Sequence, residues 1–133
     1  MTLFLLRDDD ANATTDPARL ARVYAPLLDA GLPLALSVIP EVALDTKAPD
    51  LSREAFIDAS VAPSPDAIAL TAASPLARFV ARSGGALDVL QHGTTHARAR
   101  GNTEYGALTE AEATARLARG KATLTQAFGA APV

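Results

Sequence analysis

Cysteine and tryptophan are absent from this chain of 133 residues, and aromatic residues make up only 5% of it. Without cysteine, neither a disulfide framework nor a thiolate metal site can form. The formal net charge is only −3 and no stretch concentrates Lys and Arg, so we expect no nucleic acid partner. The apolar run from Leu3 to Leu6 is too short for a signal peptide or a membrane span. We therefore expect a cytoplasmic protein without a membrane partner.

The alternation of strand and helix patterns predicts the α/β class. The length fits one domain, and 49% of the residues are apolar, which suits helices packed on a sheet. The apolar runs at 2–6 and 33–39 flank a helix pattern, so we expect a right-handed crossover and parallel pairing. We also expect strands at 67–70 and 86–91, a short helix at 52–59, and helices that begin at Pro17, Pro75 and Glu110 and end before Gly31, Gly84 and Gly129.

Three carboxylates follow the first apolar run, because Leu3 to Leu6 leads directly into Arg7-Asp8-Asp9-Asp10. The run predicts a buried strand, so the chain would leave a sheet straight into acids. Neighbouring carboxylates repel one another, and an arginine, a helix N-terminus or a cation usually compensates. Taken alone, such a triplet is more often a solvated turn or a helix-capping loop.

The segment Gln91-His92-Gly93-Thr94-Thr95-His96 follows another predicted strand and holds both histidines of the chain. Positions i and i+4 share a face on a helical turn, and Gly93 lets the backbone turn sharply. Two histidines and one carboxylate, with a position left for water, are typical of a catalytic zinc site, although other divalent metals accept these ligands. A His-x-x-x-His pair alone is more often accidental, but its combination with an acidic strand end favours a metal site.

Together, the Arg-Asp-Asp-Asp opening and the segment from His92 to His96 resemble the polysaccharide deacetylase family, which includes chitin and peptidoglycan deacetylases. The resemblance implies a distorted (β/α) barrel and a metal-dependent hydrolase that removes acetyl groups from an N-acetylated or O-acetylated carbohydrate. By this match Asp9 is the general base, and Asp10, His92 and His96 hold a divalent metal, with Zn as the expected ion.

The match leaves some positions open. Asp8 and Asp9 are the alternative acidic pair, and Ala11 stands where the family has a glycine. Residues 1–133 match, as a single domain, only the first part of the family's domain, and no third histidine is present to act as general acid. A closed barrel takes roughly 200 residues or more, so we expect an incomplete barrel whose open sheet edge permits a homo-oligomer. Tyr105 is a candidate for stacking on the sugar, although packing of its own loop is the commoner role.

Two other functions compete with the deacetylase hypothesis. A phosphoacceptor receiver domain also starts with an apolar strand that ends in paired acids, but it needs an Asp at the end of a central strand. Val38-Ile39-Pro40 supplies no such Asp, and the receiver interpretation leaves both histidines unexplained. The other rival is a degenerate module that binds metal or sugar without turnover, which the missing general acid makes a serious alternative.

Overall fold

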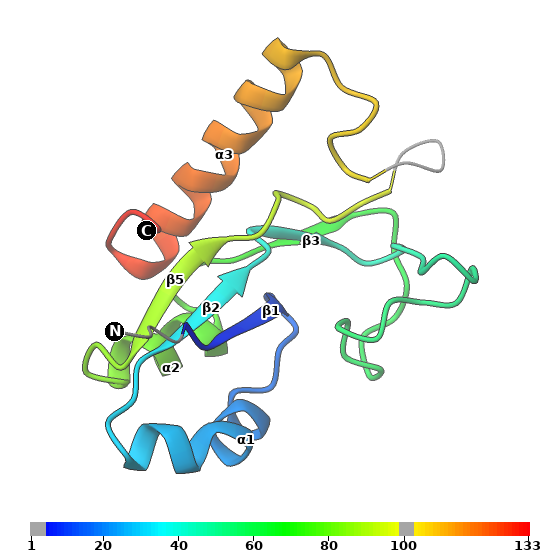
Figure 1. Cartoon of the computed structure of the whole chain (residues 1–133). Helices are drawn as coiled ribbons and strands as arrows, with labels where there is room; N and C mark the ends of the chain where they lie inside the picture. Colours follow the sequence, from blue (N-terminus) through cyan, green and yellow to red (C-terminus); the bar gives the residue numbers. More distant parts are fainter. Residues whose placement is uncertain (1–4, 99–102) are drawn as a thin grey trace.

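The three-stranded parallel sheet at the centre of the fold has the order β1-β2-β5 and does not close into a barrel (Figure 1). The computed structural model describes residues 5–98 and 103–133. The predicted α/β class and the parallel pairing of the first two strands are confirmed. Among the helices of these residues, none has both the length and the apolar character needed to cross a bilayer.

The first strand differs from the prediction, because β1 spans Arg7–Ala11 and therefore includes the acids. Leu5 and Leu6 precede the strand and are 77% and 39% exposed, so the expected buried strand at 2–6 is wrong for residues 5 and 6. Residues 2–4 of that prediction lie outside the described residues. The apolar run did not identify the strand because β1 is fixed by its backbone pairing with β2, which starts at Arg7 opposite Ala35.

The next two elements form the crossover that the sequence predicts. Helix α1 spans Pro17–Asp29, with the side chain of Asp16 accepting a hydrogen bond from the N–H of Ala18 and Pro17 in the first turn. Strand β2 spans Leu34–Val38, and every one of its residues is buried. Burial on both sides explains its continuous apolar run, as is usual for a strand in the middle of a parallel sheet.

The remaining regular elements also begin and end close to the predicted positions. Helix α2 spans Pro75–Arg82, β5 spans Leu87–Gln91, and α3 spans Glu110–Phe128. A capping box between Thr109 and Glu112 starts α3, and Gly129 ends it in the left-handed conformation. Val133 then donates its backbone N–H to the carbonyl of Val89, so the chain end runs along the side of β5 that faces away from β2.

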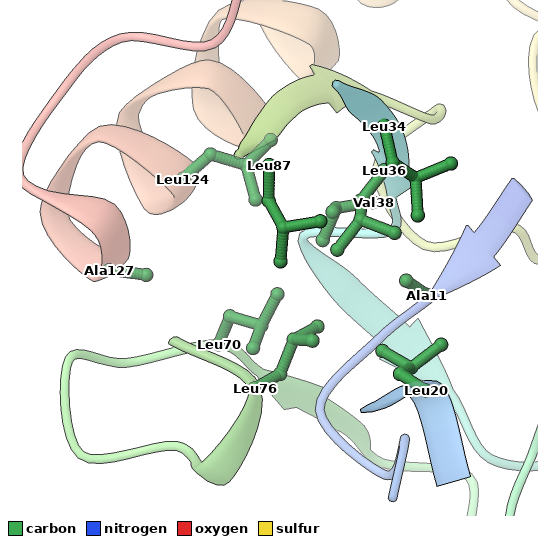
Figure 2. Packing of buried hydrophobic residues seen from close by; sticks show 10 residues of the cluster. All are labelled: Ala11, Leu20, Leu34, Leu36, Val38, Leu70, Leu76, Leu87, Leu124 and Ala127. Carbon is green, nitrogen blue, oxygen red and sulfur yellow. The ribbon is translucent and has the colours of Figure 1, made fainter. Parts of the chain in front are cut away.

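The main core lies between one face of the sheet and the three helices. Alternate residues of β2, Leu34, Leu36 and Val38, point to this side, where each helix contributes apolar side chains. Figure 2 shows the leucines of the strands and helices directed toward one another. The helical members of this cluster are Leu20 from α1, Leu76 from α2, and Leu124 and Ala127 from α3. The opposite face of β2 carries the small residues Ala35 and Ser37, which leaves room there for functional side chains.

The segment between β2 and α2 contains a small antiparallel pair, β3 at Glu41–Ala43 and β4 at Ala67–Ala69. Strand β4 confirms the expected strand, whereas β3 was not predicted. The expected helix at 52–59 is wrong, since this stretch forms turns. Asp50 and Asp58 each accept hydrogen bonds from the N–H and hydroxyl of the serine two residues later. Such local bonds compete with the helical pattern and favour turns.

Candidate metal centre

The end of β1 contains an irregularity that turns two acids toward the same side. Asp8 pairs with Leu36 and Ala11 with Val38, so Asp9 and Asp10 together lie opposite the single residue Ser37. One extra residue in a strand commonly re-aims a side chain beside a functional site. Asp10 adopts a φ of 69°, which is uncommon for a residue other than glycine. The register therefore places Asp9 and Asp10 on the Ser37 face and leaves Asp8 on the face of Leu36.

Asn12 supports this irregular strand end from inside the protein. Its side chain is fully buried and donates hydrogen bonds to the carbonyl of Asp10 at 2.8 Å and to that of Phe56 at 3.1 Å. Its side-chain oxygen accepts hydrogen bonds from the N–H and the hydroxyl of Thr14 at 2.8 and 2.7 Å. The side chain thus uses both its donors and its acceptor, and it connects β1 to the loop that carries Phe56.

The histidine loop, residues 92–96, leaves the carboxyl end of β5 beside β2. The N–H of His92 donates to the carbonyl of Val38 at 2.8 Å, which continues the sheet by one residue. Gly93 then adopts a φ of 62° and His96 a φ of 56°, so the backbone turns twice within four residues. The carboxyl ends of parallel strands meet at one edge of a sheet, and in this way β1 and β5 deliver an acid and two imidazoles to the same place.

Asp10, His92 and His96 form a compact group whose ligand atoms all lie within 4.8 Å of one another. Oδ1 of Asp10 lies 3.0 Å from Nε2 of His92 and 3.4 Å from Nε2 of His96. Ligands held about 2 Å from one ion at tetrahedral angles are separated by roughly 3.3 Å, so these spacings suit a shared metal. Asp10 is also the acid that reaches the histidines, which favours Asp9 and Asp10 over Asp8 and Asp9 as the functional pair.

The polar atoms of this group suit the coordination of a cation better than a network of hydrogen bonds. Despite its short distances to the imidazoles, Oδ1 of Asp10 is buried without a hydrogen-bond partner among the described residues. A buried carboxylate oxygen without a donor is unfavourable by about 1–3 kcal/mol or more. A cation coordinated by this oxygen and by two imidazole nitrogens removes that penalty.

The two imidazoles are oriented by different neighbours. Nδ1 of His92 lies 3.2 Å from Oγ of the buried Ser37, and such a partner for the second ring nitrogen fixes the ring of a metal ligand. The ring of His96 stacks on that of His92 with centroids 5.1 Å apart and contacts Phe56 edge-on at 4.9 Å. Nδ1 of His96 is buried without a hydrogen-bond partner within the described residues, so no hydrogen bond from Nδ1 helps the packing to orient this ring.

The other acids of β1 have separate partners. Arg7 contacts both oxygens of Asp9 at 2.9 Å, in an ion pair whose side chains are 51% and 40% exposed. This pairing agrees with the sequence-based suggestion that Arg7 compensates the acidic cluster. Asp8 instead interacts with the half-buried Tyr24 of α1. Burial, followed by the hydrogen bond to Asp8 and its negative charge, raises the pKa of Tyr24 to about 12.

Tyr105 lies behind the histidine loop. Its hydroxyl is 2.9 Å from Oγ1 of the buried Thr94, and burial raises the pKa of Tyr105 above its ordinary value. This contact agrees with the loop-packing role, whereas stacking on a substrate stays a prediction. The hydroxyl of Thr94 also donates to the backbone carbonyl of Arg116 in α3 at 2.9 Å. The loop is thereby attached to the helix as well as to the sheet.

Three residues that support the group were not identified from the sequence: Asn12, Ser37 and Glu104. The Asn-x-Thr spacing of residues 12–14 is a recognisable turn signal, so Asn12 could have been found. Ser37 lies within an apolar strand, and a single serine there matches no motif that would mark it as functional. Glu104 accepts hydrogen bonds from backbone N–H groups of the histidine loop. It is an isolated acid in a polar loop, and only the tertiary structure shows that it is buried, with 7% of the residue exposed.

A cavity of about 500 Å³ opens beside the acids at the end of β1. It is bounded by β1, by the first turns of α1, and by the loop that carries Phe56 and Asp58. Asp9 and Asp10 both line it, so a small molecule in this space would lie next to the candidate metal-binding group. Polar and apolar side chains therefore meet in a space large enough for a small ligand.

Comparisons of the chain with protein-family models, with curated proteins and with solved structures give no match, so the candidate site rests on its own geometry.

Proposed function

We propose that this chain is a metal-dependent hydrolase that holds one divalent ion, expected to be Zn²⁺, at Asp10, His92 and His96. The observation that carries the proposal is the buried Oδ1 of Asp10, which has no hydrogen-bond partner in the described part of the chain yet lies 3.0 and 3.4 Å from the imidazole nitrogens. Zinc accepts one carboxylate and two imidazoles, and three protein ligands leave a position for water. This combination is typical of catalytic rather than structural zinc.

The proposed reaction is hydrolysis of an acetyl group on an N-acetylated or O-acetylated carbohydrate. A divalent ion at this site supplies a Lewis acid that activates water and polarises an acyl carbonyl. Asp9 is the proposed general base, because the register sets it beside Asp10 on the same face of β1. The ion pair with Arg7 restricts rotation of the Asp9 carboxylate, which favours a single orientation toward the attacking water.

The arrangement of the strands supports the proposed relationship to polysaccharide deacetylases. Strands β1, β2 and β5 are parallel and lie side by side in the order in which they occur in the chain, as in a (β/α) barrel. Beyond β5, the N–H of Val133 donates to the carbonyl of Val89, where a fourth parallel strand of a barrel would pair. We propose that the sheet corresponds to the first part of a distorted barrel. An open edge of this unclosed sheet remains the candidate surface for a homo-oligomer.

The charge of the cavity supports a neutral substrate such as a sugar. Among the described residues, five aspartates and one arginine, Arg19, line it, and these acids are Asp8, Asp9, Asp10, Asp16 and Asp58. The hydrogen bonds from Ser60 hold the pKa of Asp58 below its usual value, so this carboxylate is ionised at neutral pH. A phosphorylated or carboxylated sugar would be repelled, whereas carboxylates are good acceptors for the hydroxyl groups of a neutral sugar.

Metal titration tests the binding half of the proposal. Metal-free protein should bind one equivalent of Zn²⁺, and His96→Ala and Asp10→Asn should each lose stoichiometric binding while the circular dichroism spectrum stays unchanged. Asp88→Asn is the matched control, because Asp88 is an exposed acid on β5, the strand that leads to His92, and lies outside the group. Stoichiometric binding that survives in both His96→Ala and Asp10→Asn would refute the proposed ligand set.

Turnover separates the hydrolase from the second candidate, a module that binds metal or sugar without catalysis. Both histidines of the chain belong to the candidate ligands, so no imidazole is left to protonate a leaving amine. An acetyl ester needs less help from an acid, and O-acetyl substrates should therefore be cleaved faster than N-acetyl ones. Asp9→Asn should retain Zn²⁺ but lose hydrolysis. Stoichiometric Zn²⁺ binding with no hydrolysis of either substrate class would favour the binding module.

A further inference from the structure

The carboxylate of Glu104 is buried against the backbone of the histidine loop. Oε2 accepts hydrogen bonds from the N–H groups of Thr94 at 2.9 Å and His96 at 3.1 Å. Oε1 accepts hydrogen bonds from the N–H and the hydroxyl of Thr95, at 2.8 and 2.9 Å. One side chain, only 7% exposed, therefore satisfies three consecutive amides that end at a candidate metal ligand. Successive N–H groups that converge in this way form a concave site for an anion.

The carbonyl groups of the same loop are fixed from the other side. The N–H of Glu41 donates to the carbonyl of Thr94 at 2.8 Å, and the N–H of Ala43 donates to that of Thr95 at 3.0 Å. Strand β3 thus holds the carbonyls while Glu104 holds the amides. Oε2 of Glu104 also lies 2.5 Å from the position that a Cβ on Gly93 would take, so glycine is required for the carboxylate to approach.

We infer that Glu104 is a positioning residue, which sets the loop conformation that brings His92 and His96 to one metal ion. This inference rests on the proposed metal site but not on the proposed hydrolysis. Arg116 lies 3.7 Å from Oε1, whereas the N–H of Thr95 lies 2.8 Å from the same oxygen, so the loop amides are the closer partners of the carboxylate. Nδ1 of His96 has no hydrogen-bond partner among residues 5–98 and 103–133, so the direction of this side chain depends on its ring packing and on the backbone that Glu104 holds, where φ is 56°.

The negative charge and both oxygens of Glu104 are needed for this role. Glutamine has nearly the same shape, but it offers one oxygen instead of two and places N–H donors against the N–H donors of the loop. Hydrogen bonds to a charged acceptor are roughly twice as strong as those between neutral groups. The variant Glu104→Gln therefore removes the interaction while it changes the packing very little.

The test is a competition titration of metal-free protein with Zn²⁺ against a chelator of known affinity. Glu104→Gln should weaken Zn²⁺ binding at least about tenfold, in the range that partners of metal ligands typically contribute. Two further readouts report on position and not merely on stability. The visible spectrum of the protein saturated with Co²⁺ should change, and the amides of residues 94–96 should exchange faster in the metal-free variant. Glu110→Gln, an exposed acid at the start of α3, should match the wild type in all three measurements.

The outcomes distinguish the inference from the proposed site. Equal Zn²⁺ affinity and equal Co²⁺ spectra in wild type and Glu104→Gln would overturn the role of Glu104 and leave the metal site standing. A wild-type protein that binds no Zn²⁺ would overturn both. If Glu104→Gln does not fold, Glu104→Asp decides, because its carboxylate is one methylene shorter and cannot reach all four donors. Affinity within twofold of wild type in Glu104→Asp would then overturn the inference.

Discussion

The two strand ends that form the candidate metal centre are supported in different ways. On the acid side, at the end of β1, the support within the described residues is concentrated in the buried Asn12, while Asp9 is paired only with an exposed arginine. On the histidine side, the loop after β5 is held by β3, by Glu104, and by Ser37 beneath the ring of His92. Support is thus concentrated on one side and distributed on the other.

This difference has a consequence for folding and for metal binding. The distributed hydrogen bonds of the histidine side connect it to α3, β3 and β2, so its conformation is part of the folded core and should exist before a metal arrives. The acid side positions Asp10 through a single backbone irregularity, and loss of one buried side chain releases it. Loss of Asn12 on the acid side should therefore have a larger effect than loss of any one hydrogen bond on the histidine side.

Asn12→Ala is expected to have the largest effect on stability. Four hydrogen bonds would be lost, to Asp10, Phe56 and twice to Thr14, and two partly buried carbonyls would lose this donor. At roughly 1 kcal/mol for each bond, the free energy of unfolding should fall by about 4 kcal/mol, as measured by urea denaturation. Asp16→Ala, which removes an exposed helix cap nearby, should cost only about 1 kcal/mol. Equal losses in the two variants would contradict the concentrated support of the acid side.

Gly120→Ala should destabilise the protein, although alanine is the better helix former by about 1 kcal/mol. A Cβ at this position would meet Nε2 of Gln91, and would lie 3.0 Å from Oγ1 of Thr94 and 3.1 Å from Cγ of Pro40. Gln91 would have to give up its hydrogen bonds to the carbonyls of Gly93 and Leu117, at roughly 1 kcal/mol each. The net loss should be about 1 kcal/mol, with weaker Zn²⁺ binding because the histidine loop moves.

The matched control for that prediction is the reverse change at an exposed position of the same helix. Ala118→Gly should destabilise by about 1 kcal/mol through helix propensity, without any change in Zn²⁺ affinity. An increase in stability for Gly120→Ala would show that the contact between α3 and the histidine loop is looser than these distances indicate.

The positions of most helices and strands could be predicted because their signals are local. The cap at Asp16, the prolines that open α1 and α2, and the capping box of α3 all act within a single turn. The helix expected at 52–59 failed for an equally local reason, because Asp50 and Asp58 bind the backbone two residues ahead. The start of β1 could not be predicted, since the pairing with β2 and not hydrophobicity determines it.

The residues of the candidate site could be predicted, but the neighbouring residues that hold them in place could not. The meeting of the acids with His92 and His96 could be expected, because acids and histidines at the ends of parallel strands converge on one edge. The choice of Asp10 among the three acids came only from the resemblance to polysaccharide deacetylases. The irregularity that turns Asp10 toward the histidines depends on the register between β1 and β2, and this register cannot be predicted from the sequence. Glu104 accepts hydrogen bonds from backbone N–H groups. Because almost every residue has such a group, no sequence motif identifies this contact.

Tyr105→Phe should have a small effect, confined to the histidine side. The variant loses the hydrogen bond between the tyrosine hydroxyl and Thr94, which still has the carbonyl of Arg116 as an acceptor. The free energy of unfolding should fall by about 1 kcal/mol or less, and the KM for an acetylated sugar should stay unchanged. An increase in KM with unaltered stability would instead support contact between Tyr105 and substrate.

Arg7→Gln should have the smallest effect, and its direction is informative. The ion pair with Asp9 is exposed, and such pairs contribute roughly 0–1 kcal/mol, so stability should change by less than about 0.5 kcal/mol. Zn²⁺ binding should become slightly tighter, by about twofold at low salt, because a positive charge near the candidate ligands is removed. Arg82→Gln is the control, since Arg82 is exposed just before β5 and thus lies at the opposite end of the sheet from the metal centre. Weaker Zn²⁺ binding in Arg7→Gln, with no change in Arg82→Gln, would show that the ion pair supports the acid side and that its support is not concentrated in Asn12.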